Sequence, residues 1–326
     1  MTAPKLKDFF DATIVGEIAR SISRAHPPFN ARAFTKLALD GLTDLELIAR
    51  GWHIAEALRE FLPAEFPQAA QLIIASLGPE LSGTDGWGMA PFRYLPHILY
   101  VQKYGLDHFE AAMHAQYELT KRFSAEGSIR QYLLKYPDAT YERLTQWVRD
   151  PSPHVRRLVS EGTRPRLPWA PRLRAFQEDP RPVIALLELL KDDPDRYVQR
   201  SIANNLNDIG KDNPAIAVEV CRRWIVDAPP GRAWLVRHAL RALVKQGYKP
   251  ALALLGVGEK AHVRVGNVQA PRRVRIGETA RFSFDLVSTG ADRQDVLVDY
   301  AVHFVKANGA ARPKVFKLRR VTLAPK

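Results

Sequence analysis

The stretch DPSPHVRRLVS, Asp150–Ser160, recurs as DPDRYVQRSIA, Asp193–Ala203, and this repetition indicates the fold class. The copies lie 43 residues apart, within the period of about 40–47 residues that is typical of HEAT and armadillo repeats. A weaker third copy, VRHAL at Val236–Leu240, follows 38 residues further on. In each copy a proline-rich turn precedes apolar residues at helical spacing. We therefore predict a solenoid of stacked helices rather than a chance likeness of two Asp-Pro helices.

The chain consists of two regions in which the apolar residues recur with different periods. Over residues 1–257 the apolar residues recur at helical spacing between clusters of proline and glycine, which predicts about ten to fourteen short helices. Over residues 258–326 they alternate with polar residues, as in Val296–Tyr300, which predicts β-strands. The expected fold class is mainly α: a HEAT-like α-solenoid over 1–257, then an immunoglobulin-like β-sandwich domain over 258–326. About six short strands fit into this second region, so we expect the sandwich to be small or incomplete.

The composition is that of a basic globular protein. The 326 residues include 48 Lys and Arg against 35 Asp and Glu, a formal net charge of +13, and the last 66 residues alone carry 13 of these bases and 5 of these acids. This excess favours a polyanionic partner, although charge alone does not distinguish nucleic acid from an acidic protein or membrane surface. The single cysteine, Cys221, excludes an intramolecular disulfide. No apolar run approaches the roughly 18 residues of a membrane span, so we expect a cytoplasmic protein.

Equivalent positions of stacked repeats form columns on one surface of a solenoid. The alignment predicts a basic column beside a column of carboxylate and amide groups. Such columns fit a groove for a phosphate backbone, because arginine makes bidentate contacts to phosphate. The alternative is an ordinary solvated face with i,i+4 charge pairs. The residues concerned are Arg157, Arg200 and His238 in the basic column, and Glu161, Asn204 and Asp208 beside it.

The segment after the first repeat helix is unusual. The helix is expected to end at Gly162, and a proline-punctuated turn then leads to Trp169. Trp169 lies between Pro168 and Pro171 and cannot belong to a helix interior, so we expect its ring to be displayed. A carboxylate and a tryptophan among arginines suit a cationic aromatic ligand; the alternative is a tryptophan that caps the solenoid core. The four arginines are Arg156, Arg157, Arg164 and Arg166.

Three motifs carry a resemblance to a known family: RFSAEGSIRQYL at 122–133, RRLVSEGTRPRLPW at 156–169 and SIANNLNDIGKDNP at 201–214. Together with the two-region organisation, they resemble the AlkC family of bacterial DNA alkylation repair glycosylases, in the HEAT-like repeat superfamily. The resemblance covers the whole chain. It implies an N-glycosylase that removes 3-methyladenine and 3-methylcytosine from double-stranded DNA in base excision repair, without drawing the base into a pocket. The reaction calls for no metal or cofactor. We expect a monomer that is associated with the bacterial nucleoid through DNA.

Matched motif to motif, the resemblance assigns roles to individual residues. Glu161 takes the part of the carboxylate that faces the sugar, and Glu126 helps to hold the water. Trp169 contacts the deoxyribose or the cationic base, and Asp208 is a weaker third carboxylate. A carboxylate can stabilise positive charge that develops on a sugar, as in glycoside hydrolysis. The expected DNA-binding residues are Arg156, Arg157, Arg164, Arg166, Arg200, Asn204 and His238.

The sequence lacks the residue patterns of a metal site and of a P-loop nucleotide-binding site. The histidines of the amino-terminal half have no carboxylate or cysteine at ligand spacing. The glycine-rich GTDGWG at 83–88 lacks the Lys-Ser/Thr of a P-loop, so we interpret it as a loop between helices. The rival hypothesis is a non-enzymatic HEAT-repeat scaffold that binds nucleic acid or an acidic protein. The constellation of Glu161 and Trp169 discriminates between them, because a scaffold has no need of a carboxylate among four arginines.

Overall fold

The computed structural model describes residues 5–257 and 261–326. Within these ranges the chain forms sixteen α-helices, three short 3-10 helices and four β-strands. The 3-10 helices are η1 (Leu6–Phe9), η2 (Leu42–Asp44) and η3 (Ala90–Tyr94). The α-helices are α1 (Ala12–Ala25), α2 (Ala31–Leu39), α3 (Leu47–Phe61), α4 (Phe66–Ser76), α5 (Leu95–Tyr104), α6 (Phe109–Thr120), α7 (Ile129–Lys135), α8 (Pro137–Trp147), α9 (Pro153–Gly162), α10 (Arg174–Glu178), α11 (Arg181–Leu190), α12 (Arg196–Asp212), α13 (Pro214–Ile225), α14 (Pro230–Ala239), α15 (Arg241–Lys245) and α16 (Lys249–Leu254).

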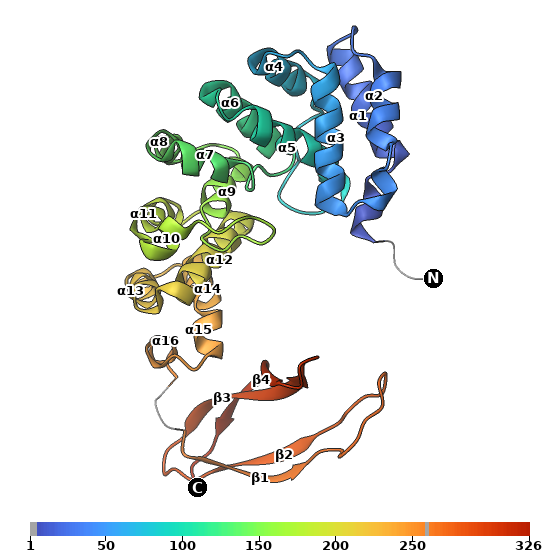
Figure 1. The fold of residues 1–326 in the computed structure, drawn as a ribbon. Coiled ribbons are helices and arrows are strands. Elements are labelled where there is room, and N and C mark those ends of the chain that lie inside the picture. Colours follow the sequence, from blue (N-terminus) through green and yellow to red (C-terminus); the bar gives the residue numbers. More distant parts are fainter. Residues whose placement is uncertain (1–4, 258–260) are drawn as a thin grey trace.

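The helices form a curved two-layered stack. Helices α4, α6, α8, α11 and α13 follow its outer edge, whereas α3, α5, α9, α12 and α14 lie on the concave side (Figure 1). One continuous core of buried aliphatic and aromatic side chains runs from Phe10 to Ala251. The predicted α-solenoid is therefore confirmed. Its helices outnumber the predicted ten to fourteen because α10, α15 and α16 are only five or six residues long, too short to show a helical period.

Local chemistry explains where the repeat helices begin. Proline occupies the first turn of α9, α13 and α14, where its missing N–H costs no hydrogen bond. Asp195 caps α12 by accepting a hydrogen bond from the Tyr197 amide. The second repeat helix, α12, packs between α9 and α14. The three aligned copies are thus neighbours in space, as the repeat predicts.

The carboxy-terminal region contains two antiparallel hairpins. Strands β1 (Val263–Gln269) and β2 (Ser283–Ser288) form one sheet, and β3 (Gln294–Val305) and β4 (Ala311–Leu323) form the other. The prediction of a small β domain is confirmed, but the described residues contain four strands rather than six. The stretch around Val274 and Ile276 forms no strand and connects β1 to β2. Its apolar side chains are exposed, so their alternation has no core to face.

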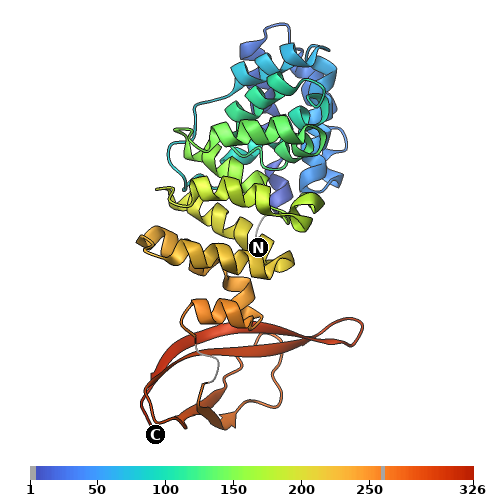
Figure 2. The same cartoon turned by 90° about the vertical axis from the view of Figure 1, so that its left-hand side faces the viewer.

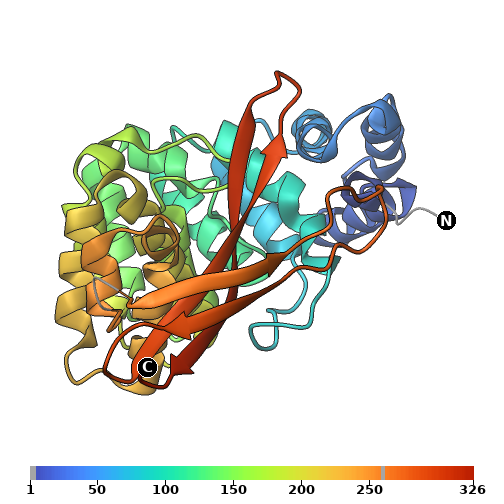
Figure 3. The ribbon, with the colours of Figure 1, turned by 90° about the horizontal axis from the view of Figure 1, so that it is seen from below.

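The hairpins lie beyond α16, at the carboxy-terminal end of the stack (Figure 2). Viewed from below, they run under the concave side towards the amino-terminal helices (Figure 3). The expected boundary at residues 257/258 falls between the end of α16 and the start of β1, and Gly258 itself lies outside the described residues. In the described part of the chain, no helix is both long and apolar enough to cross a membrane.

Candidate active site

The close approach of α7 to the end of α9 creates the centre of the candidate site. A Cβ atom at Gly162 would lie 2.5 Å from Cγ2 of Ile129, so only glycine permits this approach. The turn that precedes α7 carries Glu126, whereas Glu161 is on the last turn of α9. The glycine therefore allows two carboxylates that are far apart in the sequence to contact the same arginine, Arg157.

Arg157 links these two carboxylates. Its Nη1 lies 2.8 Å from Oε2 of Glu126, and its Nη2 lies 3.7 Å from Oε1 of Glu161. The guanidinium also stacks over the ring of Tyr197, 4.7 Å from the centroid. Although burial by itself would lower the pKa of Arg157, the charges of Glu126 and Glu161 raise it above its ordinary value. Arg157 is therefore a permanent cation between the predicted catalytic acids.

Glu161 is held as a buried anion, with only 5 % of its surface exposed. Its Oε1 accepts a hydrogen bond from Arg164 at 2.6 Å, and its Oε2 accepts one from the Ser201 hydroxyl at 2.6 Å. Burial would raise the pKa of Glu161, but the charges of Arg157 and Arg164 and the Ser201 hydrogen bond outweigh it and hold that pKa below its ordinary value. The carboxylate is ionised at neutral pH.

Trp169 is displayed, as the sequence predicts. Its side chain is 75 % exposed, and its backbone has a φ of 62°, in the left-handed region that large side chains rarely adopt. The loop is anchored by Arg130, a buried side chain that donates hydrogen bonds to the carbonyls of Gly162, Arg164 and Pro171. Strained residues of this kind concentrate at functional sites.

A cleft of about 480 Å³ opens beside these residues. Glu126, Arg157 and Trp169 line it, whereas the buried Glu161 lies behind Arg157. The GTDGWG loop forms part of the wall: Trp87 packs against the ring of His154, and His154 Nε2 contacts the Gly83 carbonyl at 3.0 Å. The loop at 83–88 therefore does more than connect two helices. The aromatic lining comprises Trp52, Trp87, Phe92, Phe123, Trp169 and Tyr197.

Three of the predicted DNA-binding arginines pair with carboxylates of the next repeat. Arg156 makes a bidentate ion pair with Asp193, and Arg166 makes a bidentate ion pair with Asp212. Arg164 bridges Glu161 to the fully buried Asp208, which Lys211 also contacts. These contacts connect the loop and α9 to α12 and to the turn that precedes it. They account for the three arginines, and for Asp208, as parts of the framework, and their contact with DNA remains a prediction.

The remaining members of the predicted columns lie further along the concave side. Arg200 is exposed and has no hydrogen bond or ion pair among the described residues. Asn204 accepts a hydrogen bond from Arg241 at 2.9 Å. His238 stacks on Trp234 with ring centroids 4.8 Å apart. Burial, together with the charges of Arg241, Arg200 and the β4 residue Lys317, lowers the pKa of His238. The β domain thus contributes positive charge to the same surface.

The sequence reasoning missed Tyr197, Ser201 and Arg130. Tyr197 could have been found, because the repeat alignment pairs it with His154, and the two rings pack 5.7 Å apart. Arg130 carried no local signal, since it acts on residues more than 30 positions away. The repeat alignment marks Ser201 as a polar residue at a position that is apolar in the other two copies, but its partner Glu161, 40 positions away, required the structure. The described residues contain no group of three or more His, Cys, Asp or Glu side chains that could hold a metal ion.

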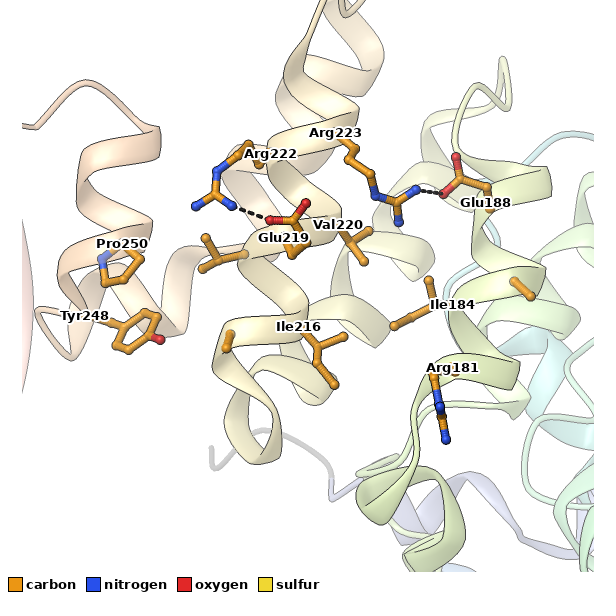
Figure 4. Close-up of a pocket in the computed structure, with 13 residues that line it drawn as sticks. Arg181, Ile184, Glu188, Ile216, Glu219, Val220, Arg222, Arg223, Tyr248 and Pro250 are labelled. Carbon is orange, nitrogen blue, oxygen red and sulfur yellow. Dashed lines mark hydrogen bonds and ion pairs between the residues drawn. The ribbon is translucent and has the colours of Figure 1, made fainter.

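A second hollow, of about 790 Å³, lies on the outer face between α11, α13 and α16. Figure 4 shows Arg222 directed at Glu219 and Arg223 directed at Glu188, around an apolar floor that includes Ile216. Both arginines are thus already neutralised by carboxylates. This hollow therefore offers little to a phosphate and lies on the face opposite to the paired carboxylates.

Fold and site together define a helical-repeat protein with a buried acidic centre framed by arginines, joined to an immunoglobulin-like domain. Residues 264–326 match the family described as the C-terminal Ig-like domain of the uncharacterised protein YhaZ. The chain is 35 % identical over 321 residues to the uncharacterized protein YhaZ of Bacillus subtilis (strain 168), a match that covers 98 % of this chain and 86 % of that protein.

A solved structure shares the whole architecture. The alkylpurine DNA glycosylase AlkC of Pseudomonas fluorescens, bound to DNA containing an abasic site analog, superposes with a TM-score of 0.90 at 37 % sequence identity. The match covers 99 % of this chain and 88 % of that one. The chain therefore belongs to the AlkC family, and the predicted family resemblance is confirmed.

Proposed function

We propose that this protein is a DNA glycosylase that hydrolyses the N-glycosidic bond of N3-alkylated cationic bases, 3-methyladenine and 3-methylcytosine, in double-stranded DNA. The observation that carries the proposal is the pair of carboxylates, Glu126 and Glu161, joined through Arg157 beside the exposed Trp169. The AlkC neighbour, whose structure was solved with abasic-site DNA, supports both the activity and the partner. The reaction would begin base excision repair in the bacterial cytoplasm.

The chemistry requires little help at the base. A base alkylated at N3 already carries a positive charge, so it leaves with the electrons of the broken C1′–N bond and becomes neutral. Positive charge then develops on the deoxyribose, where a fixed anion stabilises it. We assign this part to Glu161, which its arginines and Ser201 keep ionised at neutral pH. Because Glu161 lies behind Arg157 and does not line the cleft, its charge would act on the sugar through space rather than by contact. No metal or cofactor is required.

Glu126 is suited to binding the water molecule that attacks the sugar. Its Oε2 is occupied by Ser124 and Arg157, but the side chain lines the cleft and is 30 % exposed. In our proposal a water molecule held by Glu126 bonds to C1′ and passes its proton to this carboxylate. Trp169 packs against the deoxyribose or the cationic base, and Asp208 acts only through Arg164. The base remains near the duplex rather than entering a closed pocket.

Binding would rest on the phosphate backbone. The protein carries a formal net charge of +13, and the exposed Arg200 and the β4 residue Lys317 both act on the concave surface near His238. Phosphate contacts of this kind position a protein on DNA without reading its sequence. We expect one monomer to bind one lesion.

The test is incubation of the purified protein with methylated duplex DNA, with released bases identified by mass spectrometry and abasic sites counted. The double variant Glu126→Gln/Glu161→Gln should release no base above background. Glu219→Gln, on the outer face beside Arg222, is the matched control and should behave as wild type. Tight DNA binding without any base release would instead support the scaffold hypothesis.

A further inference from the structure

One buried position of the repeat departs from the apolar pattern. The alignment of the three copies makes Leu158, Ser201 and Ala239 equivalent. All three are buried in the helix stack, with exposed fractions of 0 %, 2 % and 3 %. Packing is thus satisfied by an apolar side chain in the first and third copies. A buried hydroxyl costs free energy unless it finds partners, so the serine of the middle copy requires a reason other than packing.

The contacts of Ser201 supply that reason. Its hydroxyl donates a hydrogen bond to Oε2 of Glu161 at 2.6 Å, and its oxygen lies 2.7 Å from the Ser160 hydroxyl, which donates to it. Oε1 of the same carboxylate accepts from Arg164. Each oxygen of Glu161 is therefore held from a different direction, which fixes the plane of the carboxylate. Hydrogen bonds to an ionised acceptor are stronger than those between neutral groups.

Ser201 differs from the arginines in one important respect. Arg157 is shared between Glu126 and Glu161 and lines the cleft, so an incoming phosphate competes for its guanidinium. A neutral, buried hydroxyl offers nothing that a phosphate can reach. Contact with DNA can therefore weaken the ion pair between Arg157 and Glu161 without disturbing the hydrogen bond from Ser201 to Glu161.

We propose that Ser201 is a positioning residue that keeps the Glu161 carboxylate ionised and correctly oriented while DNA engages the arginines. This inference rests on the proposed function. Ser201→Ala should fold normally, because alanine occupies the equivalent position 239 of the next repeat. It should nevertheless slow single-turnover release of 3-methyladenine about ten- to hundredfold at neutral pH, the effect of losing one hydrogen bond to a charged group.

The decisive readout is the titration of Glu161. With the hydroxyl gone, the pKa of Glu161 should rise, and the acidic limb of the pH–rate profile should move to higher pH. Carbon-13 NMR of labelled glutamate follows this pKa without DNA and without turnover. Ser201→Cys, which keeps a weak donor, should lie between wild type and Ser201→Ala.

The matched control is Thr163→Val. The Thr163 hydroxyl lies in the same stack, donates to the Val159 carbonyl and accepts from Asn205, but makes no hydrogen bond to the Glu161 carboxylate. This variant should lower thermal stability while leaving the pH profile unchanged. An unmoved Glu161 titration in Ser201→Ala, or an equal movement in Thr163→Val, would overturn the proposal. A raised Glu161 pKa in Ser201→Ala supports it even if the wild-type protein released no base, a result that would refute the proposed function alone.

Discussion

Glu161→Gln is the most direct perturbation of the proposed chemistry, because it removes one charge and almost no volume. Breaking a buried ion pair by removing one partner costs about 3–5 kcal/mol when the other charge is left alone. Here neither arginine is left alone, since Arg157 retains Glu126 and Arg164 retains Asp208. The cost to folding should therefore be well below that range, and the variant should remain folded and bind DNA.

The effect on catalysis should be much larger. Loss of one well-placed electrostatic stabiliser costs about 3–4 kcal/mol, or a hundred- to thousandfold in rate. The assay is single-turnover release of 3-methyladenine and 3-methylcytosine from duplex DNA, with binding measured separately by fluorescence anisotropy. Wild-type rates in Glu161→Gln would refute the assigned mechanism, even for a protein that proved to be a glycosylase.

The same carboxylate predicts a pH dependence. The pKa of Glu161 is lower in the folded protein than its ordinary value of 4.5, so the unfolded chain binds this proton more readily. The stabilisation that results is complete above about pH 4.5 and is lost as the pH falls through the folded-state pKa. The rate should likewise be insensitive to Glu161 titration at neutral pH and fall only below 4.5. An acidic limb near pH 7 would assign the essential acid or base to another group.

Three further predictions concern the exposed Trp169, the exposed Arg200 and the β domain. Trp169→Ala should slow excision with unchanged thermal stability, because the ring is 75 % exposed; a large loss of stability would show that Trp169 caps the core. Arg200→Ala should weaken binding to all duplex sequences about equally and reduce the slope of log affinity against log salt by about one, whereas an unchanged slope would exclude a phosphate contact. Removal of the residues after 257 should leave a folded helical protein with much weaker DNA binding and excision. Full activity in this truncation would show that the β domain contributes to neither.

The repeat and the two periodicities were sufficient to predict the architecture. Helical spacing reflects which residues must face a core, and this requirement acts over a few positions, so the solenoid and the adjacency of α9, α12 and α14 were predictable. The short alternating runs after residue 258 predicted a β domain in the same way. The prediction of six strands was wrong because alternation around Ile276 identifies a strand only where a core exists to bury one face, and that residue is exposed.

Only part of the candidate site could be predicted from the sequence. The prolines on either side of Trp169 were enough to predict its display, and the motifs that resemble the AlkC family located Glu126 and Glu161. The partners of the arginines required the tertiary structure. Arg156, Arg164 and Arg166 find their carboxylates on residues 37, 44 and 46 positions away, and only the stacking of α9 on α12 selects those partners over solvent or phosphate. The same stacking brings Ser201 to Glu161, because an ion pair or hydrogen bond depends on distances of a few ångströms between helices, which a periodic pattern along one helix does not contain.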